Sequence, residues 1–299
     1  MVKRETLAVR ELGAGDLDSV RRLLETSEYT YYRFAQDELP HLLATRPSVG
    51  AFTMPPGPLA RITGGTLQGY LLLNTLVSPS AWIGGFGVIW SEGPRYATYL
   101  DLLLPEIERV AAARGARTLY YSGSDLDADW LRLDFQERDF ALVTTLRSYD
   151  KYDLAVPTEG NQHVRVRPFT SGDARGVVAV EDAAFEPLWR YDEAGFVEVS
   201  ETYPYFVVAE DETGIVGYQF NAVDGEAGYL IRIAVHPRAE GQGVGARLMA
   251  EAVRYFAGQR VRRILLNTEE KNHRAHRLYE GFGFHLVHPR GFVLGREIR

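Results

Sequence analysis

The feature that most constrains this sequence is a strand, a turn and a glycine-rich helix start in immediate succession. The apolar run at residues 229–235 predicts a strand, and the turn at 236–240 leads into Gly241-Gln242-Gly243-Val244-Gly245. Three glycines in five residues allow the backbone to approach a ligand closely and to direct N–H groups outward. The following helix adds the unpaired N–H groups of its first turn and the positive end of its dipole. The stretch therefore predicts a pyrophosphate-binding turn, with a tight strand-to-helix corner as the simpler alternative.

Length and composition restrict the class of protein. The 299 residues suffice for two domains, and 45% hydrophobic with 24% charged residues is typical of globular chains. A net charge of −7 argues against a non-specific nucleic-acid binder, so we expect no nucleic-acid partner. The chain has no cysteine, which excludes disulfides, thiolate nucleophiles and Cys-based zinc sites.

Membrane and metal partners are not expected. The longest apolar run, near residues 70–77, is interrupted by Asn74 and Thr75 and is too short to span a membrane. The N-terminus lacks the apolar core of a signal peptide. The histidines show no metal-ligand spacing, so we expect no metal site. We expect a cytoplasmic protein.

The chain reads as two similar halves, 1–151 and 163–299, joined by a linker at 152–162. Each half begins with a strand followed by a Gly-Asp turn, and each continues with helices, a hairpin and further strands. The shared order favours an internal duplication. In the first half, residues 29–43 are expected to be helical, strands at 59–63 and 67–74 form a hairpin, and 140–146 form the last strand. In the second half, the last strands are expected at 284–287 and 292–294.

Two motifs of the second half resemble the GNAT family of acyl-CoA-dependent N-acetyltransferases, over residues 163–299. The first is Ile233-Ala234-Val235-His236-Pro237, followed by the glycine turn. The second, at 272–284, is Asn-His-Arg-Ala-His-Arg-Leu-Tyr-Glu-Gly-Phe-Gly-Phe, and roughly thirty residues separate the two motifs. The resemblance implies an α/β fold of the mixed-sheet (α+β) type. It consists of two tandem GNAT-like domains, each a twisted, mostly antiparallel sheet flanked by helices.

The resemblance also implies where acetyl-CoA, the cosubstrate, would bind. The strand ending at Val235 would splay from the strand at 264–267, and pantetheine would pair with Ile233 and Val235 as a pseudo-strand. A backbone N–H near Ile233 would serve as the oxyanion hole. Asn272 would either bond the pantetheine arm or cap its own helix. The implied cofactor-binding residues are Ile233, Ala234, Val235, Gly241, Gln242, Gly243, Val244, Gly245, Ala246 and Asn272.

Tyr279 matches the tyrosine of the family that protonates the departing thiolate as general acid, and the alternative is a core tyrosine on an amphipathic helix. The general base stays unassigned, because a water-mediated base is an equal alternative to any side chain. The side-chain candidates are Glu198, Glu226, His236 and Glu269.

The sequence departs from the family pattern in two places. Glu240 stands where the family has Arg or Gln, so its carboxylate must turn to solvent, with Arg238 or Arg247 supplying positive charge. In the first half, the glycine turn is replaced by Ser91-Glu92-Gly93-Pro94-Arg95, and Pro94 removes a donor that a phosphate would need. We therefore interpret residues 1–151 as a degenerate copy that shapes the substrate cleft, an arrangement similar to that of tandem GNAT proteins.

The expected activity is direct transfer of an acetyl group from acetyl-CoA to a primary amine of a small molecule, in a ternary complex. One alternative is a protein N-terminal or lysine acetyltransferase. The other is a non-catalytic, CoA-binding regulatory protein. The acceptor amine, the acyl chain length, CoA binding by the first half and the oligomeric state stay open.

Overall fold

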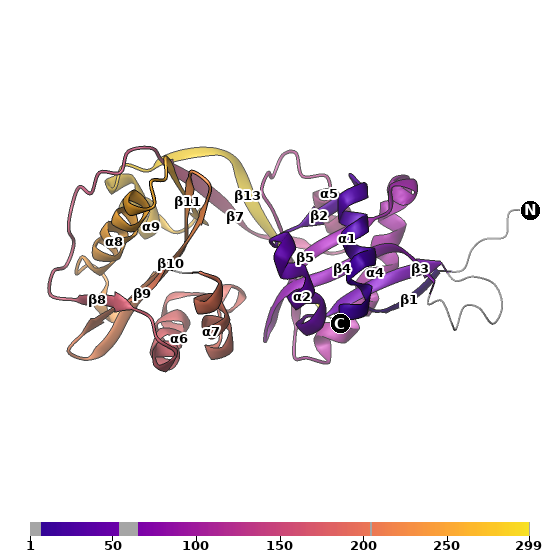
Figure 1. Ribbon diagram of the computed structural model, residues 1–299, viewed down its shortest axis with the longest axis horizontal. Helices are drawn as coiled ribbons and strands as arrows, with labels where there is room; N and C mark the ends of the chain where they lie inside the picture. Colours follow the sequence, from indigo (N-terminus) through magenta and orange to yellow (C-terminus); the bar gives the residue numbers. More distant parts are fainter. Residues whose placement is uncertain (1–6, 54–64, 204, 299) are drawn as a thin grey trace, which may run out of the picture. The chain divides into compact units, whose positions relative to one another are not determined.

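The computed structural model describes residues 7–53, 65–203 and 205–298 (Figure 1). Their contacts divide the chain into two compact units. The first comprises the described residues up to Ser122 together with Trp130–Val143 and the stretch from Val293 onward. The second comprises Gly123–Asp129 and Thr144–Phe292. No helix in the described part of the chain is long and apolar enough to cross a membrane.

The first unit is built on a mostly antiparallel sheet. Its strand order is β1-β3-β4-β5-β6, in which the pair β5–β6 is parallel and the others are antiparallel. The strands are β1 (Leu7–Glu11), β3 (Ser48–Thr53), β4 (Thr66–Val77), β5 (Ser80–Val88) and β6 (Thr118–Gly123). The helices are α1 (Leu17–Thr26), α2 (Leu39–Thr45), α4 (Tyr96–Ala112) and α5 (Arg132–Gln136). The predicted strand at 59–63 lies outside the described residues.

The helix predicted at 29–43 is wrong over most of its length. The chain forms a short strand, β2 (Thr30–Tyr32), then a 3₁₀ turn at Gln36–Glu38, and only then α2. β2 pairs antiparallel with β5. Threonine and tyrosine favour strands wherever a partner edge is free, and β5 offers such an edge.

The second unit has helices on both faces of its sheet, whose order is β8-β9-β10-β11-β12-β7, where β7 is Ala141–Lys151. The pair β11–β12 is parallel and the other pairs are antiparallel. Its strands are β8 (Arg165–Pro168), β9 (Tyr205–Asp211), β10 (Gly214–Asp224), β11 (Ala227–Val235) and β12 (Arg263–Glu269). Its helices are α6 (Ala174–Ala184), α7 (Glu193–Thr202), α8 (Val244–Gly258) and α9 (His273–Gly281).

Alternating residues of β9 separate the two faces of this sheet. Phe206 and Val208 share a core with α6 and α7, whereas Val207 and Ala209 share one with α8. In Figure 1, α6 and α7 accordingly lie on one side of β9 and β10, and α8 lies on the other. The predicted fold class, a mixed and mostly antiparallel sheet flanked by helices, is confirmed.

Two long strands, β7 (Ala141–Lys151) and β13 (His285–Glu297), contribute residues to both units. β7 extends past the predicted end at 146, and its residues 146–151 pair with β12. β13 is one continuous strand where two pieces are predicted, and its residues from Val293 onward belong to the first unit. The units therefore end at other residues than the predicted halves, 1–151 and 163–299.

Candidate active site

A gap opens between β11 and β12, as the family resemblance implies. Pairing between the described residues of these strands ends at Tyr229 and Leu265. Two residues later, β11 carries a bulge: Leu230 faces Asn221 and Arg232 faces Phe220, so Ile231 is an extra residue. A bulge bends its strand and increases the local twist, which accounts for the splay.

The backbone of β11 presents alternate residues to this gap. The N–H of His236 donates to the carbonyl of Val216 on β10, at 2.8 Å. In an antiparallel pair, every second residue points its N–H and C=O the same way, so Ala234 also faces β10. Ile233 and Val235 consequently direct their backbone groups away from β10, toward the gap. The two residues predicted to pair with pantetheine thus share one open edge.

The glycine turn leads from the end of β11 into α8. Gly241 and Gly243 have φ angles of +73° and +78°, in the left-handed region that residues with a Cβ rarely adopt. α8 begins directly afterwards, so the N–H groups of Val244, Gly245 and Ala246 have no acceptor within the helix. The side chain of Gln242 is turned back, donating to the Arg238 carbonyl at 2.9 Å. The turn therefore presents main-chain donors.

The charges beside this turn differ from the expectation. Glu240 forms an ion pair with Arg274 on α9. Arg238 pairs with an aspartate at 3.5 Å, and Arg247 pairs with Glu251 at 2.8 Å. Arg274, which the sequence reading missed, is thus the cation beside Glu240. Its place in the second motif, two residues after Asn272, is the signal that could have revealed it.

Helix α9 carries Asn272 and Tyr279. The Asn272 Oδ1 accepts the N–H of Ala275 at 3.1 Å and so caps the helix. Tyr279 is only 5% exposed, and its ring lies 5.8 Å from that of Tyr149 and 6.1 Å from that of Phe284. In the described part of the chain, its hydroxyl has no hydrogen-bond partner. Burial raises the pKa of Tyr279, which keeps the hydroxyl protonated at neutral pH.

A buried hydrogen-bond chain lies beside Tyr279. The hydroxyl of Tyr149 on β7 lies 2.5 Å from Nδ1 of His276. The Nε2 of His276 lies 3.2 Å and 3.1 Å from the carbonyl oxygens of Glu269 and Glu270. Carbonyls only accept, so Nε2 carries the proton and Nδ1 accepts from the tyrosine. The sequence did not indicate Tyr149, because this residue lies before the linker, in the half that was interpreted as a degenerate copy.

The four candidate bases are not brought together. Glu226 lies in the turn before β11 and pairs with Arg262 at 3.1 Å. The Nδ1 of His236 accepts the N–H of Arg238 at 3.1 Å and caps a short 3₁₀ turn. Glu198 lies on α7. Glu269 ends β12 and lies 3.6 Å from a lysine, Lys271. Glu269 alone ends a strand that borders the gap.

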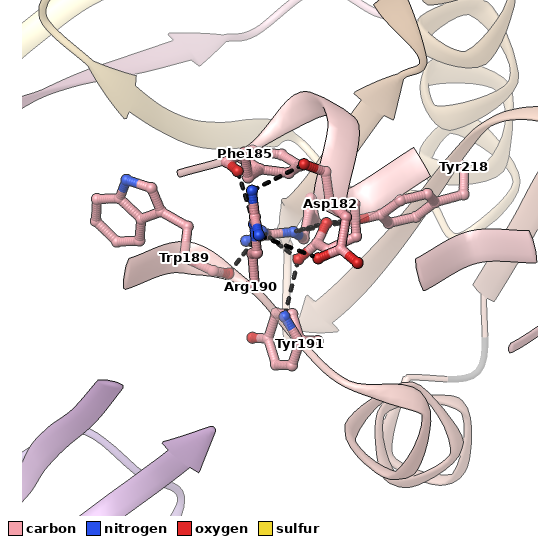
Figure 2. Close-up of polar contacts among 8 residues, drawn as sticks. Asp182, Phe185, Trp189, Arg190, Tyr191 and Tyr218 are labelled. Atoms are coloured by element: carbon pink, nitrogen blue, oxygen red, sulfur yellow. Dashed lines mark hydrogen bonds and ion pairs between the residues drawn. The ribbon is translucent and has the colours of Figure 1, made fainter. Parts of the chain in front are cut away.

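A buried ion pair fixes the segment between α6 and α7 against β11. Glu181 is fully buried and accepts from Arg232 at 2.6 Å and from the Tyr218 hydroxyl. Arg232 also donates to the Trp189 carbonyl at 2.7 Å, and Glu181 accepts the N–H of Tyr191 at 3.0 Å. Figure 2 labels Trp189, Tyr191 and Tyr218 among the polar contacts of this segment. The segment between α6 and α7 is thus bonded to Arg232, the residue that precedes Ile233 on β11.

Comparison with known proteins gives relatives in sequence. The model of the acetyltransferase (GNAT) family matches residues 172–284. Mycothiol acetyltransferase of Kineococcus radiotolerans is 31% identical over 243 residues, which are 76% of this chain and 77% of that protein. A putative [ribosomal protein bS18]-alanine N-acetyltransferase of Bacillus subtilis is 27% identical, over 40% of this chain and 78% of its own length.

Solved structures share the fold at low identity. A tandem GNAT protein from the clavulanic acid biosynthesis pathway has a TM-score of 0.65 at 14% identity, covering 98% of this chain and 99% of that one. A GCN5-related N-acetyltransferase from Sphaerobacter thermophilus has a TM-score of 0.61 at 17% identity, covering 98% and 96%. The Kineococcus relative is 31% identical and is matched over 77% of its length, and the family model matches residues 172–284. The chain therefore belongs to the GNAT family of acetyltransferases.

Proposed function

We propose that the second unit binds acetyl-CoA between β11 and β12 and transfers the acetyl group to a primary amine of a small molecule. The observation that carries the proposal is the open backbone edge of Ile233 and Val235, which leads directly into the glycine turn. An extended pantetheine arm can add to such an edge as a further strand would.

The residues present fit the diphosphate of this substrate. Gly241 and Gly243 place no side chain at the turn, and the first N–H groups of α8 supply donors with the helix dipole behind them. The pairing of Glu240 with Arg274 removes the main objection, because the carboxylate already has a cation beside it. The proposed contacts are those predicted from the sequence, with Asn272 acting as the helix cap.

The reaction is a direct attack on the thioester. The nitrogen lone pair of the amine forms a bond to the carbonyl carbon, and the N–H of Ile233 stabilises the resulting oxyanion. The carbon–sulfur bond then breaks, and Tyr279 donates its proton to the departing thiolate. The attacking nitrogen loses its own proton to water or to Glu269, the candidate base that ends β12.

A small-molecule acceptor is supported by the relative that covers most of the chain, which is named for mycothiol. The relative named for a ribosomal protein covers 40% of the chain. A protein acceptor is therefore the second candidate.

The test is thioester cleavage with a panel of small amines and peptides. For Tyr279→Phe we expect kcat to fall about 10²–10⁴-fold with little change in acetyl-CoA binding. The matched control is Tyr255→Phe on α8, whose ring stacks on Tyr205 and which should keep full activity. Turnover of peptides alone would favour a protein acetyltransferase. Tight acetyl-CoA binding with no turnover of any amine would favour a regulatory protein.

A further inference from the structure

The first unit contains an edge equivalent to that of β11. β5 pairs antiparallel with β4 and parallel with β6, and its pairing with described residues of β6 ends at Trp82 and Tyr120. Val88 on β5 faces Gly69, as Val235 on β11 faces Gly217. By this register, Phe86 and Val88 correspond to Ile233 and Val235.

In the first unit, however, the chain itself fills this edge. β2 pairs with β5 in the register Thr30 to Gly87, Tyr31 to Phe86 and Tyr32 to Gly85. The N–H of Val88 donates to the Tyr29 carbonyl at 3.2 Å, and the N–H of Arg33 donates to the Gly84 carbonyl at 2.8 Å. The main-chain groups that a pantetheine arm would need are thus bonded to protein.

β2 is also attached to the other side of the gap. The Tyr31 hydroxyl donates to the carbonyl of Ser122 at 2.7 Å, and the Tyr31 ring lies 4.9 Å from that of Tyr121 on β6. Gly87 allows this close fit, since a Cβ there would lie 3.0 Å from Thr30 and 2.8 Å from Tyr70. β2 therefore spans the gap from β5 to β6.

The segment after β5 is also less suited to a diphosphate than the turn before α8. It forms a 3₁₀ helix, Trp90–Arg95, that includes Pro94 and precedes α4 directly. Proline carries no N–H, so this turn presents fewer donors than the turn before α8. The filled edge and the donor-poor turn are therefore two separate observations against coenzyme A binding in the first unit.

We infer that β2 occupies, within its own chain, the position that pantetheine takes in the second unit, so that each chain binds one acetyl-CoA. The inference rests on the proposed function of the second unit. The first unit is then a GNAT-like fold whose binding edge is satisfied by a peptide strand, and it has no cosubstrate site of its own.

The test combines binding stoichiometry with hydrogen exchange on the full chain, with coenzyme A as the probe. Calorimetry should give one coenzyme A per chain. Amide hydrogen exchange in peptides covering residues 231–246 should slow when coenzyme A binds. Peptides covering residues 83–95 should exchange slowly already in the free protein, and their exchange should not change on binding. Two molecules per chain, or new protection at 83–95, would overturn the inference and leave the proposed function standing. No binding would overturn both.

A substitution in the glycine turn tests whether the single coenzyme A site lies in the second unit. Gly243→Val places a β-branched side chain at a φ of +78° and should abolish binding, so that the stoichiometry falls from one to none. The control is Gly258→Ala at the end of the same helix, where an added Cβ meets nothing within 4 Å. If Gly243→Val keeps one site of undiminished affinity, the coenzyme A is bound elsewhere and the inference is wrong. Protection of residues 83–95 in the same protein reports whether the first unit is folded.

Discussion

Replacing Arg232 with methionine should destabilise the second unit severely, because Glu181 would become a buried charge without a cation. The carboxylate is 0% exposed, and the guanidinium 2.6 Å away is its only ion-pair partner in the described part of the chain. After the change it keeps the Tyr218 hydroxyl and the Tyr191 N–H. Methionine preserves an unbranched apolar stem, so the main loss is electrostatic.

The expected loss in the free energy of unfolding follows from the cost of leaving one charge of a buried ion pair without its partner. Removing one partner of a buried pair costs about 3–5 kcal/mol, since water cannot solvate the remaining charge. For a unit of this size, that corresponds to a decrease in Tm of about 6–20 °C. The matched control is Arg262→Met, which breaks a 3.1 Å pair with Glu226 whose side chains are 79% and 66% exposed. Exposed pairs contribute at most about 1 kcal/mol.

The assay is urea and thermal unfolding of both variants, followed by circular dichroism. Replacing both members, as Glu181→Leu with Arg232→Met, should recover part of the loss, because no buried charge then remains. A loss for Arg232→Met no greater than that for Arg262→Met would refute the reasoning. It would mean that Glu181 reaches water or another cation.

Three further predictions concern single side chains of the second unit. Hydrogen bonds from Arg167 lower the pKa of Asp173 to about 2, from its usual 3.8. The Tm of the wild type should therefore be higher than that of Asp173→Asn above pH 4, and this difference should vanish as the pH falls through about 2. A difference in Tm that does not depend on pH would contradict this. Tyr149→Phe leaves Nδ1 of buried His276 without a donor and should cost about 1–3 kcal/mol in urea unfolding, whereas an unchanged midpoint would show that water replaces the hydroxyl. Asn272→Ala should cost about 1 kcal/mol and Asn272→Asp much less, and equal losses would argue against the capping role.

The local features of the site could be predicted from the sequence because each depends on residues close together in the chain. The strand before the glycine turn, the helix after it and the capping asparagine all follow from periodicity, glycine and side-chain chemistry within a few positions. The splay between β11 and β12 came only through the family resemblance. Its physical cause, the bulge at Ile231, depends on the register with β10.

Contacts between residues distant in sequence were decided by the tertiary structure alone. Arg274 is 34 residues from Glu240, and Tyr149 is 127 residues from His276, so no local pattern connects them. Residues 30–32 show the same limit most clearly. Periodicity does not separate helix from strand in so short a segment, and the open edge of β5 made it a strand. By itself, the sequence determined the family and the turn beside β11, since these depend on local chemistry. Only tertiary structure decided which backbone edges stay open, because an edge is satisfied by whichever segment the fold brings to it.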